Sequence, residues 1–125
     1  MKNTQSGPAK VSRNTVKNHF QKAYSLSEEQ AEIMLSSSAQ SLNSFLSALT
    51  QIAGNEEKLA EIARLGHSLK GVLLNMGEER WADLARSLEC WAAAGESRDY
   101  EKIVAAIRLG MEDVMRGNGG NKDTT

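Results

Sequence analysis

Hydrophobic residues recur at steps of three and four along most of the chain, which is the spacing of amphipathic helices. Alternation with a period of two, typical of half-buried strands, does not occur over any comparable length. The sequence therefore predicts an all-α fold. The expected helices are a short one over residues 12–23 and four longer ones over residues 28–53, 56–76, 79–94 and from Ser97 or Asp99 to about 114.

Cap residues and glycines mark the ends of these helices. Ser27 and Gln30 have the spacing of a capping box at the start of the second helix. Gly54, Gly77 and Gly95 end the second, third and fourth helices, since glycine favours the left-handed conformation that closes a helix. Four long helices with connections this short predict an antiparallel up-down four-helix bundle. The short first helix is expected to lie across one end of that bundle.

The predicted bundle domain covers residues 11–116. Residues 1–10 are polar and contain the only proline, so we expect a flexible N-terminal arm there. Residues 117–125 are polar and rich in glycine, and we expect a flexible C-terminal tail. A chain of 125 residues is large enough for one domain with one core.

Composition narrows the class of protein. Hydrophobic residues make up 40% and charged residues 25%, which is typical of a globular domain. The net charge of -1 gives no basic surface for nucleic acid. No apolar run approaches the roughly 18 residues of a membrane span, and the N-terminus has no apolar run like that of a signal peptide. We expect a cytoplasmic, monomeric protein that binds neither nucleic acid nor membrane.

Cys90 is the only cysteine, so no disulfide can form within the chain. The fourth helix turns Cys90 away from its apolar stripe, which predicts an exposed thiol without a function. We interpret Trp81 and Trp91 as packing residues and assign no function to His19.

The third helix holds the candidate functional residue, His67. With Ile62 set at zero and 100° per residue, the apolar stripe centres at about 330° and His67 falls at about 140°. His67 is therefore predicted to lie exposed in the middle of a helix. Arg64 and Lys70, three residues to either side, lie within about 60° of it and can reach an anionic group attached to the histidine, such as a phosphoryl group.

Two glycines of the same helix predict space for two different neighbours: another protein at Gly71 and a helix of the same bundle at Gly66. Gly71 follows His67 by one turn on the same face, although a glycine inside a helix costs about 1 kcal/mol relative to alanine. Its missing side chain leaves space for another protein beside the histidine. Gly66 turns toward the core side, which predicts close packing of a neighbouring helix.

The stretch from His67 to Gly77 resembles the signature of the histidine-containing phosphotransfer (HPt) domain family: histidine, any residue, leucine, lysine, glycine, and a second glycine six residues later. His67, Leu69, Lys70, Gly71 and Gly77 match this signature. The similarity extends more weakly over residues 25–115. A match of five residues at these spacings, on one helix of a predicted bundle, is fairly specific.

This resemblance implies a phosphorelay intermediate of two-component signalling. His67 would accept a phosphoryl group from a phospho-aspartate on a receiver domain and pass it to another receiver. Lys70 and Arg64 would stabilise the phosphoryl group, and Gly71 would give steric access. The partners would be receiver domains of a hybrid sensor kinase, a response regulator or both. The partner would supply the catalytic machinery and a Mg²⁺ ion, so we expect no cofactor, no metal site and no enzymatic activity in this chain.

The predicted receiver docking surface comprises Ala63, Leu74, Glu78 and an acidic side chain at position 60. Family members often have small residues at the positions of Val72, Leu73 and Leu74. Val72 and Leu73 fall on the core side of the helix and should alter packing. Leu74 faces the partner and is expected to influence which receiver docks.

Other interpretations of the sequence are open. A helical adaptor could keep the fold and bind a receiver or kinase without being phosphorylated, although an adaptor has no need of the glycine at position 71. A general-base enzyme would need a second polar group converging on His67. A metal-binding bundle would need Glu-x-x-His motifs, which neither histidine has. We expect a free-standing protein, while a module of a larger chemotaxis-type kinase remains an alternative.

Overall fold

The computed structural model describes residues 8–116, which form helices and no strand. The predicted C-terminal tail and residues 1–7 of the predicted arm lie outside the described residues. The all-α prediction is confirmed. The elements are α1 (Arg13–Tyr24), α2 (Glu28–Ile52), a 3-10 turn η1 (Glu56–Lys58), α3 (Leu59–Asn75), α4 (Glu79–Ala93) and α5 (Tyr100–Gly110).

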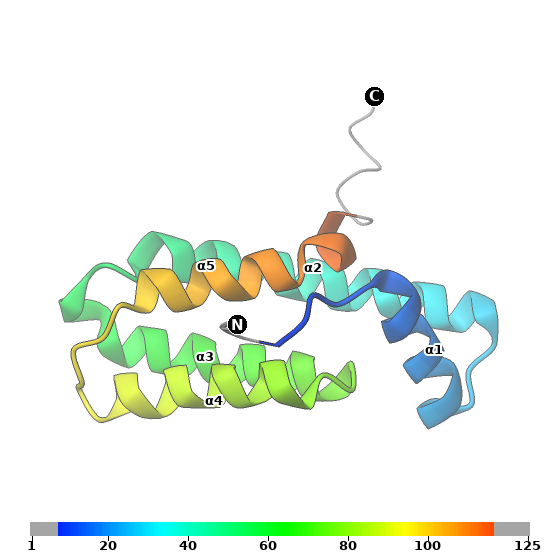
Figure 1. The fold of residues 1–125 in the computed structure, drawn as a ribbon, viewed down its shortest axis with the longest axis horizontal. Coiled ribbons are helices and arrows are strands. Elements are labelled where there is room, and N and C mark those ends of the chain that lie inside the picture. Colours follow the sequence, from blue (N-terminus) through cyan, green and yellow to red (C-terminus); the bar gives the residue numbers. More distant parts are fainter. Residues whose placement is uncertain (1–7, 117–125) are drawn as a thin grey trace, which may run out of the picture.

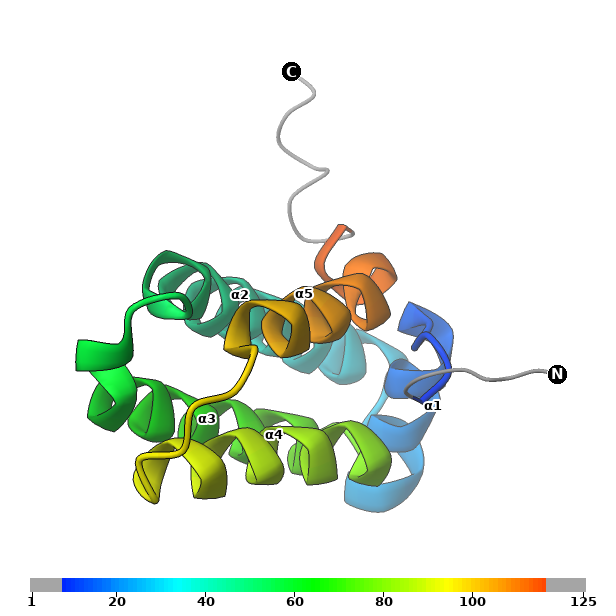
Figure 2. The same ribbon diagram turned by 60° about the vertical axis from the view of Figure 1, so that its left-hand side comes forward.

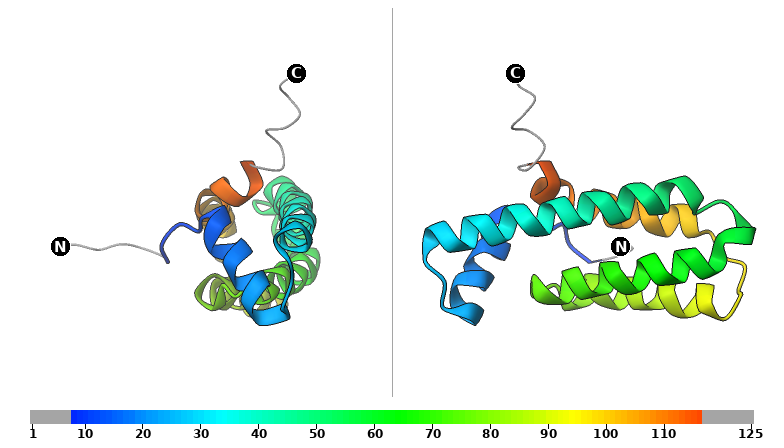
Figure 3. Two further views of the ribbon diagram at one scale, coloured as in Figure 1. Left: turned by 90° about the vertical axis from the view of Figure 1, so that its right-hand side faces the viewer. Right: turned by 180° about the vertical axis from the view of Figure 1, so that it is seen from behind.

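Helices α2 to α5 run up and down beside one another and form the predicted antiparallel bundle (Figure 1). They make two layers, α2 with α5 and α3 with α4 (Figure 2). The first half of α2 extends past the end of the α3–α4 hairpin. Helix α1 packs against this extension and lies across the end of the bundle, as the sequence predicts (Figure 3).

The predicted helix ends at Ser27, Gly77 and Gly95 are confirmed by hydrogen bonds or dihedral angles, whereas Gly54 does not adopt the expected left-handed conformation and α2 ends at Ile52 with Ala53 as its C-cap. The Ser27 hydroxyl accepts from the Gln30 backbone N–H at 3.1 Å, and the Gln30 side chain accepts from the Ser27 N–H at 2.9 Å. This is the capping box that satisfies two orphan donors of α2. Gly77 and Gly95 have φ angles of 79° and 75°, a conformation in which other residues are strained.

The core is built from apolar side chains of all five helices. The fifth predicted helix ends earlier than expected, at Gly110, because the Gly110 carbonyl accepts from the Val11 N–H at 2.9 Å and the chain turns at Met111. A further helical turn follows over residues 112–116. The largest fully buried side chains are Phe20, Leu35, Leu42, Leu46, Leu49, Ile62, Leu69, Leu73, Met76, Leu88, Ile107 and Met111.

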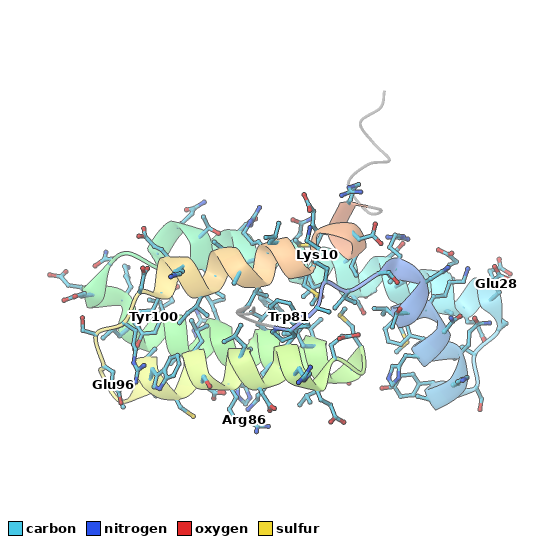
Figure 4. The ribbon with its side chains drawn as sticks, viewed as in Figure 1. Lys10, Glu28, Trp81, Arg86, Glu96 and Tyr100 are labelled. Atoms are coloured by element: carbon cyan, nitrogen blue, oxygen red, sulfur yellow. The ribbon has the colours of Figure 1, made fainter. Side chains whose placement is uncertain are left out.

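The end of the predicted arm is tied to the bundle. The Trp81 indole N–H donates to the Ala9 carbonyl at 2.9 Å, and the Trp81 side chain points inward from α4 (Figure 4). Trp81 is buried, as predicted, and Gly110 leaves room for its ring. The contacts of the bundle therefore begin at Ala9, before the predicted boundary at residue 11.

Gly110→Ala is expected to lower the free energy of unfolding by about 1–3 kcal/mol, since the added methyl group would overlap the Trp81 ring. Urea unfolding followed by circular dichroism measures this change. Gly71→Ala is the matched control, because a methyl group there meets no atom within 4 Å. That control should be as stable as the wild type or gain up to about 1 kcal/mol. Equal stability of Gly110→Ala and wild type would contradict the packing described.

Candidate functional site

His67 lies in the middle of α3 with 67% of its side chain exposed, which confirms the prediction of an accessible histidine. The cause is the apolar stripe on the opposite side of the helix. Leu65, Leu69 and Leu73 are buried there, and Val72 packs against the same core. The burial of this stripe orients α3, so the histidine is held toward solvent by the packing of the whole bundle.

The closest partner of His67 is Glu89 on α4, a residue that the sequence analysis did not identify. The His67 Nδ1 atom lies 3.0 Å from the Glu89 Oε2 atom. The Lys70 Nζ atom lies 3.2 Å from the other carboxylate oxygen, Oε1. This ion pair does not have hydrogen-bond geometry, so buried Oε1 is stabilised by charge alone. Glu89 thus joins a histidine and a lysine of α3 to α4.

Close packing of α3 on α4 makes this contact possible. A Cβ atom at Gly66 would lie 3.0 Å from a methyl carbon of Leu88 and 3.3 Å from the backbone nitrogen of Glu89. The prediction that Gly66 accommodates a neighbouring helix is confirmed. Because the two backbones approach at this point, the carboxylate of Glu89 reaches the Nδ1 atom of the His67 ring.

Burial raises the pKa of the Glu89 carboxyl group, but contacts with Lys70 and His67 lower it by more, and the net pKa lies below its ordinary value. Glu89 is therefore ionised at neutral pH. Its contribution to stability is present above the ordinary carboxyl pKa and is lost as the pH falls through the lowered folded-state pKa.

An ionised carboxylate fixes which nitrogen of His67 carries the proton. The carboxylate can only accept hydrogen bonds, so in the neutral ring the proton sits on Nδ1, which donates to Glu89. Nε2 then keeps its lone pair. Among the described residues nothing is hydrogen bonded to Nε2. The geometry therefore leaves Nε2 as the ring nitrogen with a free lone pair.

The two predicted cations are placed differently. The Lys70 side chain is only 20% exposed and is held at Glu89. The Arg64 side chain is 66% exposed and pairs with Glu61 at 3.2 Å, on its own helix. The structure thus links Lys70 to the histidine through a carboxylate and leaves Arg64 on the surface one turn away.

Gly71 opens the surface beside the histidine. No atom lies within 4 Å of the position that a Cβ at Gly71 would occupy, which agrees with the predicted free space. Leu74, one turn further along α3, has 44% of its surface exposed, as predicted for a residue that faces a partner. Ala63 is half-buried. The surface beside His67 toward the C-terminal end of α3 therefore has open space at Gly71 and an exposed leucine at position 74.

One predicted docking residue is wrong, and the structure places another outside α3. Position 60 is occupied by the exposed Ala60, so the expected acidic side chain there is wrong, and the nearest carboxylate belongs to Glu61. Glu78 lies beyond the end of α3, at the N-cap of α4, where it is half-buried. Burial raises the pKa of Glu78, partly offset by the charge of His19. Glu78 belongs to the helix connection and does not extend the exposed face of α3.

Helix α1 contacts the C-terminal end of α3 and the connection that follows it. The Tyr24 hydroxyl donates to the Asn75 carbonyl at 3.2 Å. A Cβ atom at Gly77 would lie 2.6 Å from the Nδ1 atom of His19, so the His19 ring packs directly against the α3–α4 connection. His19 therefore has a packing role. Cys90 is exposed, as predicted.

Within residues 8–116 no group of three or more histidine, cysteine, aspartate or glutamate side chains could hold a metal ion. None of the helices in that range is long and apolar enough to cross a membrane.

An exposed histidine at the centre of one helix of an antiparallel bundle is the arrangement expected of a helical phosphotransfer domain. A family model of the Hpt domain matches residues 29–117. The chain belongs to the Hpt domain family, whose members are phosphotransfer domains of two-component signalling. Neither the curated proteins nor the solved structures include a match to the chain.

Glu89→Ala is expected to move the neutral His67 ring from the Nδ1–H form toward the Nε2–H form, because the acceptor for Nδ1–H is lost. Nitrogen-15 chemical shifts of the ring, recorded above pH 8, measure the two forms. His19 serves as an internal control and should keep its shifts. An unchanged ratio of the two forms at His67 would show that Glu89 does not select the tautomer.

Proposed function

We propose that this protein is a phosphorelay intermediate in which His67 accepts a phosphoryl group from a receiver-domain phospho-aspartate and passes it to another receiver. The observation that supports this most directly is the arrangement of His67, which is exposed while its Nδ1 atom lies 3.0 Å from Glu89. A helical adaptor would need neither an oriented imidazole nor the open space at Gly71.

In the proposed reaction the Nε2 lone pair attacks the phosphorus atom of the phospho-aspartate. The bond from phosphorus to the aspartate oxygen breaks, and its electron pair returns to that carboxylate. The imidazole ring becomes positively charged as the new bond forms. Glu89 stabilises that charge through the Nδ1–H bond, as a carboxylate orients and supports a reacting histidine in other sites. The reverse sequence delivers the phosphoryl group to the next receiver.

In this reaction Lys70 balances the negative charge of Glu89. The negative charge of Glu89 favours the imidazolium but repels an incoming phosphoryl group, which carries roughly two negative charges. Lys70, at 3.2 Å from the Glu89 carboxylate, offsets that repulsion. We therefore assign Lys70 to the positioning and charge balance of Glu89.

The receiver partner supplies the remaining chemistry in this proposal. It brings the phospho-aspartate, the Mg²⁺ ion and the surrounding catalytic groups, so the chain acts as a phosphoryl carrier without catalytic machinery or cofactor of its own. Its docking surface is centred on His67 and includes Ala60, Ala63 and Leu74. Contacts of this kind are small and transient, which suits a protein that must bind two receivers in turn.

His67→Gln is expected to abolish labelling when the protein is incubated with a receiver phosphorylated with ³²P. Glutamine keeps a polar side chain at the exposed position but has no nucleophilic ring nitrogen, so the fold should be retained. His19→Gln is the matched control, since it removes the other histidine of the chain. It should accept label at the wild-type level. Label retained by His67→Gln would refute the assignment of the phosphorylated residue.

Gly71→Ala is expected to slow phosphoryl transfer from a receiver about tenfold or more, which corresponds to at least 1.4 kcal/mol of barrier. The reason is the loss of open space beside the histidine. Phosphorylation of the same variant by phosphoramidate, a small donor, should proceed at the wild-type rate. Equal slowing with both donors would show that the glycine affects the histidine itself, and an unchanged transfer rate would remove its role in access.

A further inference from the structure

The position of the His67 ring determines which cation can reach a phosphoryl group on it. Side chains of an α-helix lean toward its N-terminus, so the ring of His67 covers the preceding turn, which contains Ala63 and Arg64. The Nδ1 edge of the ring faces Glu89. A phosphoryl group on Nε2 therefore extends over the turn of Arg64, and the small side chain of Ala63 leaves room for it.

Lys70 is already engaged by Glu89. Its side chain leans toward the turn of Gly66 and His67, where its Nζ atom lies 3.2 Å from the Glu89 carboxylate and only 20% of the side chain is exposed. Withdrawing Lys70 would leave the Glu89 Oε1 atom, which is buried and has no hydrogen bond, without its cation. The structure thus favours a lysine that stays at Glu89 in both states of the histidine.

Arg64 is free to change partner. Its ion pair with Glu61 joins two exposed side chains of one helix, and pairs of this kind contribute little to stability. A phosphoryl group offers two charges and three acceptor oxygens in place of a single carboxylate. The planar guanidinium matches those oxygens with two parallel hydrogen bonds, which an ammonium group cannot do.

We propose that Arg64 binds the phosphoryl group on His67 and leaves Glu61 to do so, so that Glu61 competes with the phosphoryl group for the arginine. This inference rests on the proposed function and assigns Arg64 and Lys70 separate tasks. Glu61 then controls how firmly the phosphoryl group is held: a stronger Arg64–Glu61 pair favours release to the next receiver.

The experiment uses the full chain phosphorylated with phosphoramidate, and it measures the pH midpoint of the ³¹P chemical shift of the phosphohistidine. Loss of a nearby cation disfavours the dianion, so Arg64→Ala should raise the proton affinity of the phosphoryl group about two- to fivefold. Arg116→Ala is the matched control. Arg116 is 62% exposed and also has a carboxylate three residues before it, Asp113, at 3.8 Å. It should leave the midpoint unchanged.

Glu61→Gln tests the competition. It should lower the proton affinity in the wild-type background and have no effect when combined with Arg64→Ala, because Glu61 acts through the arginine. The same shift in both backgrounds would show that Glu61 acts on the phosphoryl group directly and would overturn the competition.

The remaining outcomes separate this proposal from the proposed function. A phosphorylated Arg64→Ala variant with an unchanged midpoint would overturn the role of Arg64 alone. So would a midpoint that responds to Lys70→Ala and not to Arg64→Ala. A wild-type chain that takes no phosphoryl group at His67 would overturn the proposed function, and the role of Arg64 with it.

Discussion

The close contact of α3 with α4 at Gly66 is the constraint on which the site depends. A Cβ atom at Gly66 would lie 3.0 Å from a Leu88 methyl carbon and 3.3 Å from the Glu89 backbone nitrogen, so these neighbours would have to shift by a few tenths of an ångström. The Glu89 Oε2 atom lies 3.0 Å from the His67 Nδ1 atom, so a shift of the Glu89 backbone would change the length of this hydrogen bond. The orientation of an exposed histidine is thus set by a glycine that faces the interior of the bundle. Packing in the core and chemistry at the surface are connected through this contact.

Gly66 and Gly71 lie on one helix and act in opposite ways. At Gly66 the missing side chain is filled by a neighbouring helix, whereas at Gly71 it leaves open solvent. Both glycines weaken α3 as an isolated helix, by about 1 kcal/mol each relative to alanine. The buried leucines of α3 compensate for this, together with α1, which holds the C-terminal end of α3 through Tyr24 and Asn75. A firmly packed helix can therefore present a histidine with unobstructed surroundings.

The periodicity of α3 was sufficient to predict the exposure of His67, the open space at Gly71 and the close packing at Gly66. These are properties of a single helix and follow from its 3.6-residue repeat. Glu89 could not be identified in this way, because its contact with His67 depends on the register of α4 against α3. Its position beside Leu88, which packs on Gly66, was the available signal. The sequence analysis assigned Lys70 and Arg64 the same role because both lie three residues from His67. Spacing along one helix does not show that Lys70, and not Arg64, contacts a carboxylate of α4.

The balance of charges around His67 suits a phosphoryl carrier. Two carboxylates and two cations offset one another before phosphorylation: Glu89 with Lys70, and Glu61 with Arg64. In the proposed function, phosphorylation of His67 would add a dianion and convert the ring to a cation, which Glu89 would stabilise from the helix side. Because a phosphoryl group on the exposed His67 would stand in solvent, its attraction to a cation would be weakened by the high dielectric constant of water. A buried phosphoryl group would be held too tightly and reached too rarely. In the proposed relay, the exposure of His67 would therefore limit the stability of the phosphorylated state, so that the phosphoryl group could pass on to the next receiver.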